Sequence, residues 1–247
     1  MLESDGSRRF VAHVERRVAR GNLSGWIYVT TFPDIAVIVP AHNEELYVER
    51  ALRSLVHQSL ADDMYEIILV DDGSEDATAR IAEKFVPQVR LLTNETCLGL
   101  PASINRGIQE ANARYVVRVD ADDYVHPDFL RILHLFLDLN PHMSAIACDY
   151  FKVNADEEHV SREAVDTSPI GCGIMFRKER LVEIGLYDES FLMAEDLDLR
   201  LRFERKWPIH RVELPLYRYR FHGENMTSDR EDYDGYIERA MRKNADE

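Results

Sequence analysis

This 247-residue chain has few cysteines, few basic residues and no long apolar run, and each of these shortages excludes certain classes of protein. It has only three cysteines, Cys97, Cys148 and Cys172. They are too few and too scattered for a disulfide framework or a thiolate metal site, so we expect reduced, partly buried thiols. No apolar run approaches the roughly 20 residues of a membrane-spanning helix, and the N-terminus lacks a continuous signal-peptide core. We therefore expect a cytoplasmic protein that either is free in solution or associates peripherally with a membrane.

Basic residues are also in short supply. The chain has 30 Lys and Arg against 45 Asp and Glu, a formal net charge of −15. Nucleic-acid binding needs a basic footprint, so this balance argues against a nucleic-acid partner. A phosphorylated small ligand held with a metal stays compatible, because a local site can reverse the sign of the net charge. With 45% hydrophobic and 30% charged residues, the composition is that of an ordinary globular protein.

The first half of the chain alternates between apolar runs and amphipathic stretches. We predict strands at 34–40, 65–73, 89–93 and 114–120, and helices at 43–59, 74–86 and 100–113. Asn43 is the expected N-cap of the first helix. Strands that are apolar throughout and alternate with helices predict βαβ units and a mostly parallel sheet. After a helix at 126–140, strands at 143–153, 169–176, 209–214 and 216–221 and helices at 177–185 and 195–206 predict a more mixed half, with a polar loop at 154–169.

Three polar clusters follow predicted strands, at 40–44, 71–74 and 120–123. Ligands of parallel sheets bind beyond the carboxyl ends of the strands, so these clusters should meet in one cleft. Unpaired carboxylates would repel each other there, which favours a cation among them. Asp120 and Asp122 form a D-x-D pair that could hold Mg²⁺ or a similar ion beside a phosphate. The alternative is a solvated acidic turn in which Asp122 or Asp123 caps the next helix. Asp123 is expected to cap that helix or to orient its neighbours.

Four segments, in this order, carry a resemblance to a known family. "VIVPAHNEE", "ILVDDGSED", "LGLPASINRGIQEANARYVVRVDADDYVHPDFL" and "LMAEDLDLRLRF" resemble the motifs of family-2 glycosyltransferases with the GT-A fold, over about residues 35–225. The resemblance implies an α/β fold of the GT-A (Rossmann-like) type, in which helices flank a mostly parallel central sheet and a mixed-sheet half holds the acceptor. It also implies inverting, metal-dependent transfer of one sugar from a nucleotide-diphosphate sugar, most simply UDP-linked, to a hydroxyl of a carbohydrate, lipid-linked or protein acceptor.

The same resemblance assigns roles to individual residues. Asp196 is similar to the family's catalytic base, and Glu195 lies beside it. Gly171 and Gly173 fall where relatives contact the acceptor and the donor sugar. Asp122 and Asp120 match the ligands of Mn²⁺ or Mg²⁺, and His222 matches a third ligand found in part of the family. The residues that the resemblance places against the nucleotide sugar are Pro40, Ala41, Asn43, Glu44, Asp71 or Asp72, Arg118, Asp120, Ala121 and Asp122.

The expected organisation is an N-terminal appendage at 1–33, a glycosyltransferase domain at 34–225 and a helical tail at 226–247. Within the domain, 34–124 forms the nucleotide-binding half and 125–225 the acceptor half. The Q-x-x-R-W motif of processive synthases is missing, which favours transfer of a single sugar. Two alternatives remain. A sugar-phosphate nucleotidyltransferase would need a glycine-rich basic loop where this chain has "PAHNEE", and a non-catalytic nucleotide-sugar-binding module would not need Asp120, Asp122 and Asp196 together.

Overall fold

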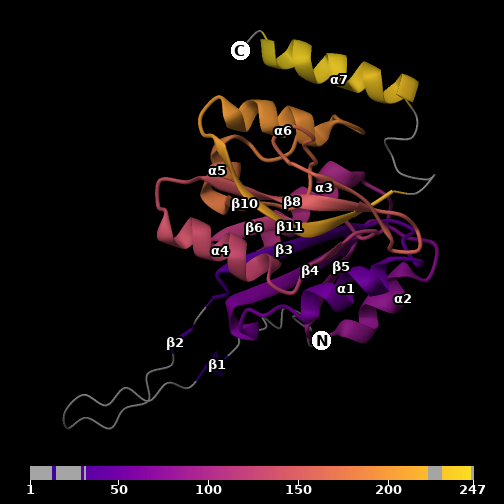
Figure 1. Ribbon diagram of the computed structural model, residues 1–247. Helices are drawn as coiled ribbons and strands as arrows, with labels where there is room; N and C mark the ends of the chain where they lie inside the picture. Colours follow the sequence, from indigo (N-terminus) through magenta and orange to yellow (C-terminus); the bar gives the residue numbers. More distant parts are fainter. Residues whose placement is uncertain (1–12, 15–28, 31, 222–229, 246–247) are drawn as a thin grey trace, which may run out of the picture.

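The computed structural model describes residues 13–14, 29–30, 32–221 and 230–245, and its elements follow the predicted alternation of strands and helices (Figure 1). The strands are β1 His13–Val14, β2 Val29–Thr30, β3 Ile35–Ala41, β4 Tyr65–Asp71, β5 Val89–Thr93, β6 Tyr115–Arg118, β7 Tyr124–Val125, β8 Ala145–Val153, β9 His159–Glu163, β10 Ile174–Arg177 and β11 Ile209–Arg220. The α-helices are α1 Val48–Val56, α2 Thr78–Ala82, α3 Leu100–Glu110, α4 Phe129–Leu139, α5 Lys178–Glu183, α6 Glu195–Glu204 and α7 Arg230–Ala245. Short 3₁₀ turns occupy Asp62–Met64 and Glu83–Phe85. None of the helices in this described part of the chain has the length and apolar content to cross a membrane.

A nine-stranded sheet forms the centre of the molecule, in the order β5-β4-β3-β6-β10-β8-β11-β7, with β9 paired to β8. Strands β5, β4, β3 and β6 run parallel to one another. The direction changes at β10, which is antiparallel to both β6 and β8, while β11 runs parallel to β8. The sequence prediction of an α/β fold with a mostly parallel half and a mixed half is therefore confirmed.

Each face of this sheet is covered by its own set of helices. Along β3, Ile35, Val37 and Val39 belong to one buried cluster, and Ala36 and Ile38 belong to the other. This alternation follows from the two-residue repeat of a strand. The first cluster takes in apolar side chains of α1 and α4, and the second takes in those of α3, α5 and α6. Helices on both faces explain why the strands read as continuous apolar runs in the sequence.

The structure corrects several local predictions. Helix α1 begins at Val48 rather than at Asn43, and Asn43 adopts a left-handed conformation with φ 55° in the preceding turn. Strand β9 lies within the predicted polar loop 154–169, because it pairs with the edge of β8. The two predicted strands near the C-terminal end are one strand, β11, with an irregularity in its pairing around Pro215.

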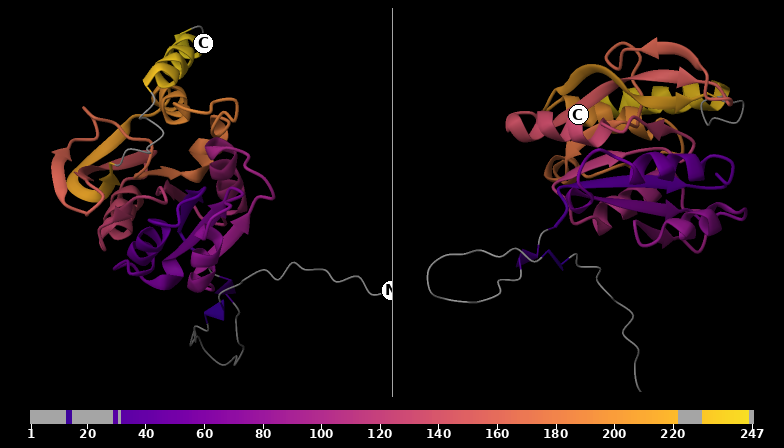
Figure 2. Two further views of the ribbon diagram at one scale, coloured as in Figure 1. Left: turned by 90° about the vertical axis from the view of Figure 1, so that its right-hand side faces the viewer. Right: turned by 60° about the horizontal axis from the view of Figure 1, so that its bottom comes forward.

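Helix α7 lies outermost, against the side of α6 that faces away from the sheet (Figures 1 and 2). It falls within the range where the sequence predicts a helical tail. Residues 1–12, 15–28 and 31 of the predicted N-terminal appendage lie outside the described residues. Both predicted halves, 34–124 and 125–225, contribute strands to this one sheet, so the sheet itself does not divide the chain into two functional parts.

Candidate active site

A cleft of about 700 Å³ opens at the carboxyl ends of β3, β4 and β6. Segments from distant parts of the sequence line it, including the turn after β3, the loop before α3, the D-x-D turn, residues 169–172 and residues 192–196. The cleft therefore lies where a ligand of a parallel sheet is expected. The predicted site residues that line it are Pro40, Ala41, Asn43, Glu44, Asp72, Arg118, Asp120, Ala121, Asp122, Gly171, Glu195 and Asp196.

Asp72 holds the loop that forms one wall of the cleft. Its carboxylate accepts hydrogen bonds from the backbone N–H groups of Leu98 and Gly99 at 2.9 and 2.8 Å and from Nδ2 of Asn94 at 2.6 Å. Burial by itself would raise the pKa of Asp72, but these hydrogen bonds outweigh it and lower the pKa below its usual value. Asp72 thus stays ionised and fixes the loop. Of the two predicted alternatives, Asp72 lines the cleft and Asp71 is not among its described lining residues.

Gly73 follows Asp72 and makes the close approach of the two loops possible. Its φ is 69°, and a Cβ at this position would lie 2.8 Å from the backbone nitrogen of Cys97. A glycine is needed here for both reasons. On the other side, the N–H of Asn43 donates to Oγ of Ser74 at 2.9 Å, and Oδ1 of Asn43 accepts from the N–H of Glu75. Asn43 therefore joins the turns after β3 and β4.

Arg118 lies between two carboxylates at the bottom of the cleft. Its guanidinium donates to both oxygens of Asp120, at 2.5 and 3.1 Å, and to Oε1 of Glu195 at 2.9 Å. Burial disfavours the charge on Arg118, but Asp120 and Glu195 raise the pKa of Arg118 well above its ordinary value. Burial also raises the pKa of both carboxyl groups, against the opposing effect of the arginine. The structure thus directs Arg118, which was predicted to contact the nucleotide sugar, at two acidic side chains.

Asp123, the third carboxylate of the turn, is 1% exposed and serves the fold. It accepts hydrogen bonds from the hydroxyl of Tyr217 and from the backbone N–H of Arg220, both at 2.7 Å. Burial raises the pKa of Asp123 well above its usual value, and the neighbouring Asp122 raises it further. Helix capping by Asp123 is wrong, because α4 begins only at Phe129. The alternative, that Asp123 orients its neighbours, is what the structure shows.

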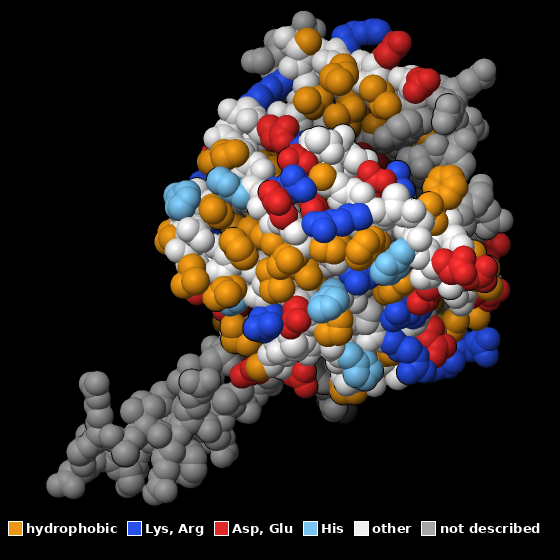
Figure 3. All heavy atoms as spheres, viewed as in Figure 1, with side chains coloured by type: hydrophobic (Ala, Val, Ile, Leu, Met, Phe, Trp, Pro, Cys, Tyr) orange, Lys and Arg blue, Asp and Glu red, His pale blue; other side chains and the backbone are white. Residues whose placement is uncertain are grey.

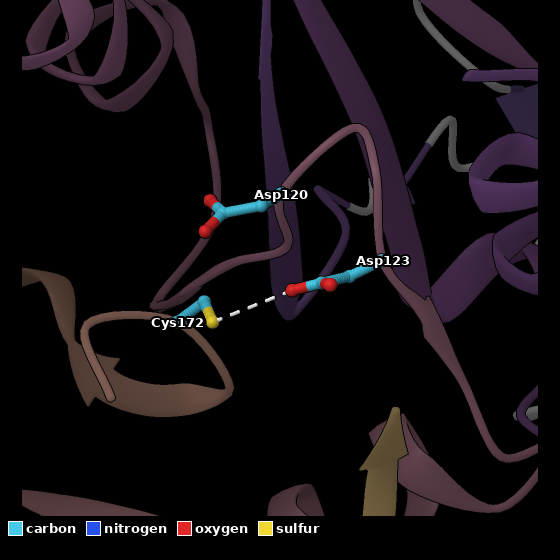
Figure 4. Close-up of side chains that lie close together, drawn as sticks. All are labelled: Asp120, Asp123 and Cys172. Atoms are coloured by element: carbon cyan, nitrogen blue, oxygen red, sulfur yellow. Dashed lines mark hydrogen bonds between the residues drawn. The ribbon is translucent and has the colours of Figure 1, made fainter. Parts of the chain in front are cut away.

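Two sets of side chains in this region qualify as possible metal ligands. Asp120, Asp123 and Cys172 have ligand atoms within 4.8 Å of one another (Figure 4). Both oxygens of Asp123 already accept hydrogen bonds, and the soft Cys172 thiol is protonated because burial raises its pKa. This set suits a hard divalent cation poorly.

Asp122 fits such a cation better. It lines the cleft beside Asp120, and Nε of Arg220 donates to the backbone carbonyl of Asp122 at 2.8 Å, which fixes the turn. Carboxylate oxygens next to a space for phosphate are what Mg²⁺ and Mn²⁺ require, so the Asp122 carboxylate fits a divalent metal, whereas both oxygens of Asp120 already accept hydrogen bonds from Arg118. His222, the predicted third ligand, lies outside the described residues.

Asp196 stands in the first turn of α6 and lines the cleft. The helix is preceded by Ala194, which has the left-handed φ of 56°. Consecutive residues at the helix start point differently: Glu195 is 5% exposed and pairs with Arg118, whereas Asp196 lies beside Gly171 and lines the cleft. Both carboxylates line the cleft, but Glu195 is buried and paired with Arg118, whereas Asp196 packs against Gly171.

The two predicted glycines have different environments. Gly171 lines the cleft, as predicted. Gly173 has φ 71°, and a Cβ there would lie 3.0 Å from the ring of Tyr217. Its close approach is to an aromatic ring of β11, so the structure gives no support to a ligand contact for Gly173. Sequence reasoning also missed Tyr217 and Arg220, which hold the D-x-D turn. The alternation of tyrosine and arginine along β11 was the sequence feature that could have indicated these two residues.

The chain is similar in sequence and in fold to known proteins. The family model described as Glycosyl transferase family 2 matches residues 36–196. An uncharacterised glycosyltransferase of Haemophilus influenzae is 30% identical over 129 residues, which are 51% of this chain and 39% of that protein.

Two groups of solved structures share the fold. Staphylococcus aureus TarS 1-349 in complex with UDP-GlcNAc superposes with a TM-score of 0.71 at 23% identity, over 84% of this chain and 65% of that chain. The mannosyltransferase PcManGT of Pyrobaculum calidifontis, in complex with GDP-Man and Mn²⁺, superposes with a TM-score of 0.66 at 19% identity, over 86% of this chain and 65% of that chain. The chain spans about two fifths or less of the length of the curated relatives that it matches first.

Proposed function

The chain belongs to glycosyl transferase family 2, and from that premise we propose that it transfers a single sugar from a nucleotide-diphosphate sugar to an acceptor hydroxyl, with inversion at the anomeric carbon. The observation that carries this proposal is that one cleft is lined by Asp72, Asp122 and Asp196, which come from three separate motifs. UDP is the nucleotide we favour, because the structurally similar TarS was solved with UDP and with UDP-GlcNAc.

Asp196 is the general base of this proposal. It would remove the proton from the acceptor hydroxyl as the hydroxyl oxygen attacks the anomeric carbon, and the nucleoside diphosphate would leave from the opposite face. A single displacement inverts the anomeric centre and needs no covalent glycosyl-enzyme. The position of Asp196 in the same cleft as the D-x-D turn supports this role.

Asp122 would be the main ligand of a divalent cation, Mn²⁺ or Mg²⁺, with Asp120, which Arg118 holds beside it, and His222 as candidate further ligands. When bound, the cation neutralises the charge that develops on the departing diphosphate. The complex of PcManGT with GDP-Man and Mn²⁺ supports a metal in this family of folds. Arg118 keeps Asp120 and Glu195 in place, so that Asp122 and Asp196 remain directed to the cleft.

Pro40, Ala41, Asn43, Glu44 and Asp72 would form the nucleotide side of the cleft, in the half at 34–124. The half at 125–225 would receive the acceptor, with Gly171 and Glu195 near the reacting groups. A carbohydrate, a lipid-linked sugar or a protein fits the chemistry of a hydroxyl acceptor.

A panel of nucleotide sugars tests the proposal. With Mn²⁺ present, one UDP-sugar should raise the melting temperature of the protein, since a ligand selective for the folded state stabilises it. The same UDP-sugar should release UDP when an acceptor is added, and NMR of the product should show the inverted anomeric configuration. Retention of configuration, or stabilisation by nucleoside triphosphates with release of pyrophosphate, would overturn it. The latter result would indicate a nucleotidyltransferase.

A further inference from the structure

Helix α7 lies beyond the residues that the family model matches, yet it is firmly attached to the catalytic part of the molecule. Ala240, on the side of α7 that meets α6, is 0% exposed. In Figure 3, hydrophobic side chains gather in the region of α6 and α7, between charged ones. This packing indicates that α7 holds neighbouring parts of the molecule in position.

Lys243 of α7 joins two points that flank the predicted base. Its Nζ lies 2.8 Å from Oδ2 of Asp188 and 2.8 Å from Oδ1 of Asp198. Asp198 is 0% exposed and also accepts from Arg202 at 2.8 Å and from Asn244 at 3.0 Å. A carboxylate buried this completely needs its cationic partners. Lys243 therefore fixes the start of the segment 188–198 and the first turn of α6 relative to each other.

Arg239, one turn earlier in α7, holds the middle of the same segment. Its guanidinium donates to the carbonyl oxygen of Ser190 at 3.0 Å and to Oγ of Ser190 at 2.8 Å. The guanidinium carbon also lies 4.5 Å from the ring centroid of Phe191, which is 0% exposed. Nζ of Lys243 lies 5.3 Å from the same ring. Arg239 and Lys243 thus hold the ring of Phe191 against α7.

The residues that follow Phe191 reach the cleft directly. Leu192, Met193 and Asp196 all line it, and Leu192 is 60% exposed. Between them lies Ala194, whose left-handed φ of 56° is an uncommon conformation that persists only where the surroundings impose it. The segment therefore has one side anchored by α7 and the other side exposed to the cleft.

We propose that α7 positions the catalytic wall of the cleft, with Lys243 as the positioning residue that sets Asp196 through Asp188 and Asp198. This inference rests on the proposed role of Asp196. Loss of the anchor would let the segment 188–196 move while leaving the nucleotide side intact, because Pro40, Ala41, Asn43, Glu44 and Asp72, which form that side, lie at the ends of β3 and β4 and in the turns that follow them. Turnover in sugar transfer should then fall without a loss of UDP affinity.

The test compares Lys243→Met with Arg242→Met in the full chain. Arg242 is adjacent, and its side chain is 79% exposed. Hydrogen exchange should accelerate in peptides covering 188–196 of the Lys243→Met protein and stay unchanged in β3 and β4. Its kcat for transfer should fall by about 10- to 100-fold, the cost expected for a misplaced catalytic group, with Mn²⁺-dependent UDP binding within about twofold of wild type. Arg242→Met should match wild type in all three measurements, and Lys243→Arg, which keeps the charge, should recover most of the turnover.

Equal exchange in Lys243→Met and Arg242→Met would overturn the inference. So would faster exchange with normal kcat, since the segment would then move without affecting the base. If the wild-type protein itself transfers no sugar, the proposed function fails, but the exchange experiment still decides whether Lys243 anchors the segment.

Discussion

Gly171 presents its bare Cα to the side chain of Asp196. A Cβ built on Gly171 would lie 2.5 Å from Cβ of Asp196 and 2.8 Å from its Oδ2. Both residues line the cleft. The missing side chain at position 171 therefore determines where the carboxylate of Asp196 can lie.

Replacement of Gly171 by alanine should displace Asp196, because the added methyl group would overlap the carboxylate. We expect kcat for sugar transfer to fall about 100-fold, as for a reacting group moved by about 1 Å, with UDP affinity unchanged. Steady-state kinetics and a UDP titration measure the two effects. Gly235→Ala is the matched control, since a Cβ at Gly235 meets nothing within 4 Å. Normal turnover of Gly171→Ala would contradict the close packing as a determinant of activity.

Asp196→Asn should abolish general-base catalysis while keeping the shape of the side chain. We expect transfer to fall by about 10²- to 10⁴-fold, the usual range for a lost acid–base group. Calorimetry should show that the UDP-sugar still binds. Glu204→Gln, at the far end of the same helix, is the control and should retain wild-type turnover. A variant of Asp196 with near-normal turnover would show that another group removes the proton.

Asp122→Ala should abolish the dependence of UDP binding on Mn²⁺. In the wild type we expect Mn²⁺ to tighten UDP binding, and in the variant UDP should bind equally weakly with Mn²⁺ or with a chelator. The reason is that a divalent ion beside a diphosphate depends on the few carboxylates that hold it. Asp138→Ala, a change of a half-exposed carboxylate on α4, should leave the Mn²⁺ effect intact. A metal-independent wild type would exclude the assigned role of the D-x-D turn.

The parallel half of the fold could be predicted from the sequence because its signals are local. Strand β5 spans Val89–Thr93, as predicted, β3 is shifted by one residue from its predicted range, and β4 ends two residues earlier than predicted. Apolar runs between helices define these strands without knowledge of their partners. By contrast, β9 is a strand only because it pairs with the edge of β8, and its polar sequence gives little indication of that.

The sequence predicted which residues line the cleft better than it predicted the hydrogen bonds and ion pairs among them. Motif order brought Asp122 and Asp196 into the same cleft, as expected. The partners of Asp123 lie 94 and 97 residues away, at Tyr217 and Arg220, and no sequence pattern joins them. The pairing of Arg118 with Glu195, 77 residues apart, is likewise a product of the tertiary fold.

Arg118→Met should destabilise the protein more than any change of a surface arginine. It would leave Asp120 and Glu195 close together and buried without their common cation, and breaking a buried ion pair costs about 3–5 kcal/mol. Denaturant unfolding monitored by circular dichroism measures the loss. Arg53→Met is the control, because the Arg53 side chain is 60% exposed and its pair with Glu49 is solvated, so its effect should be small. A variant at position 118 as stable as the one at position 53 would show that the three charges do not depend on each other.

Asp149→Asn should change the acid side of the stability profile. Asp149 is 1% exposed on β8 and accepts hydrogen bonds from Arg211 at 2.7 Å and from Arg162 at 3.1 Å. Burial acts to raise its pKa, but the two arginines outweigh burial and lower it. A carboxyl group with a lowered pKa in the folded state stabilises the fold above its unfolded pKa of about 3.9. That stabilisation is lost as the pH falls through the lower, folded value.

The free energy of unfolding of the wild type should therefore exceed that of Asp149→Asn at neutral pH, and the two should converge below about pH 3.9. Urea unfolding at several pH values from neutral to below the folded pKa of Asp149 measures the difference. Asp166→Asn is a matched control, because Asp166 pairs with the same Arg211 but its side chain is 53% exposed. The Asp166→Asn curve should follow the wild type across the whole range. A constant gap between wild type and Asp149→Asn down to the lowest pH would mean that the carboxylate charge of Asp149 contributes nothing, and that the variant loses stability only through packing.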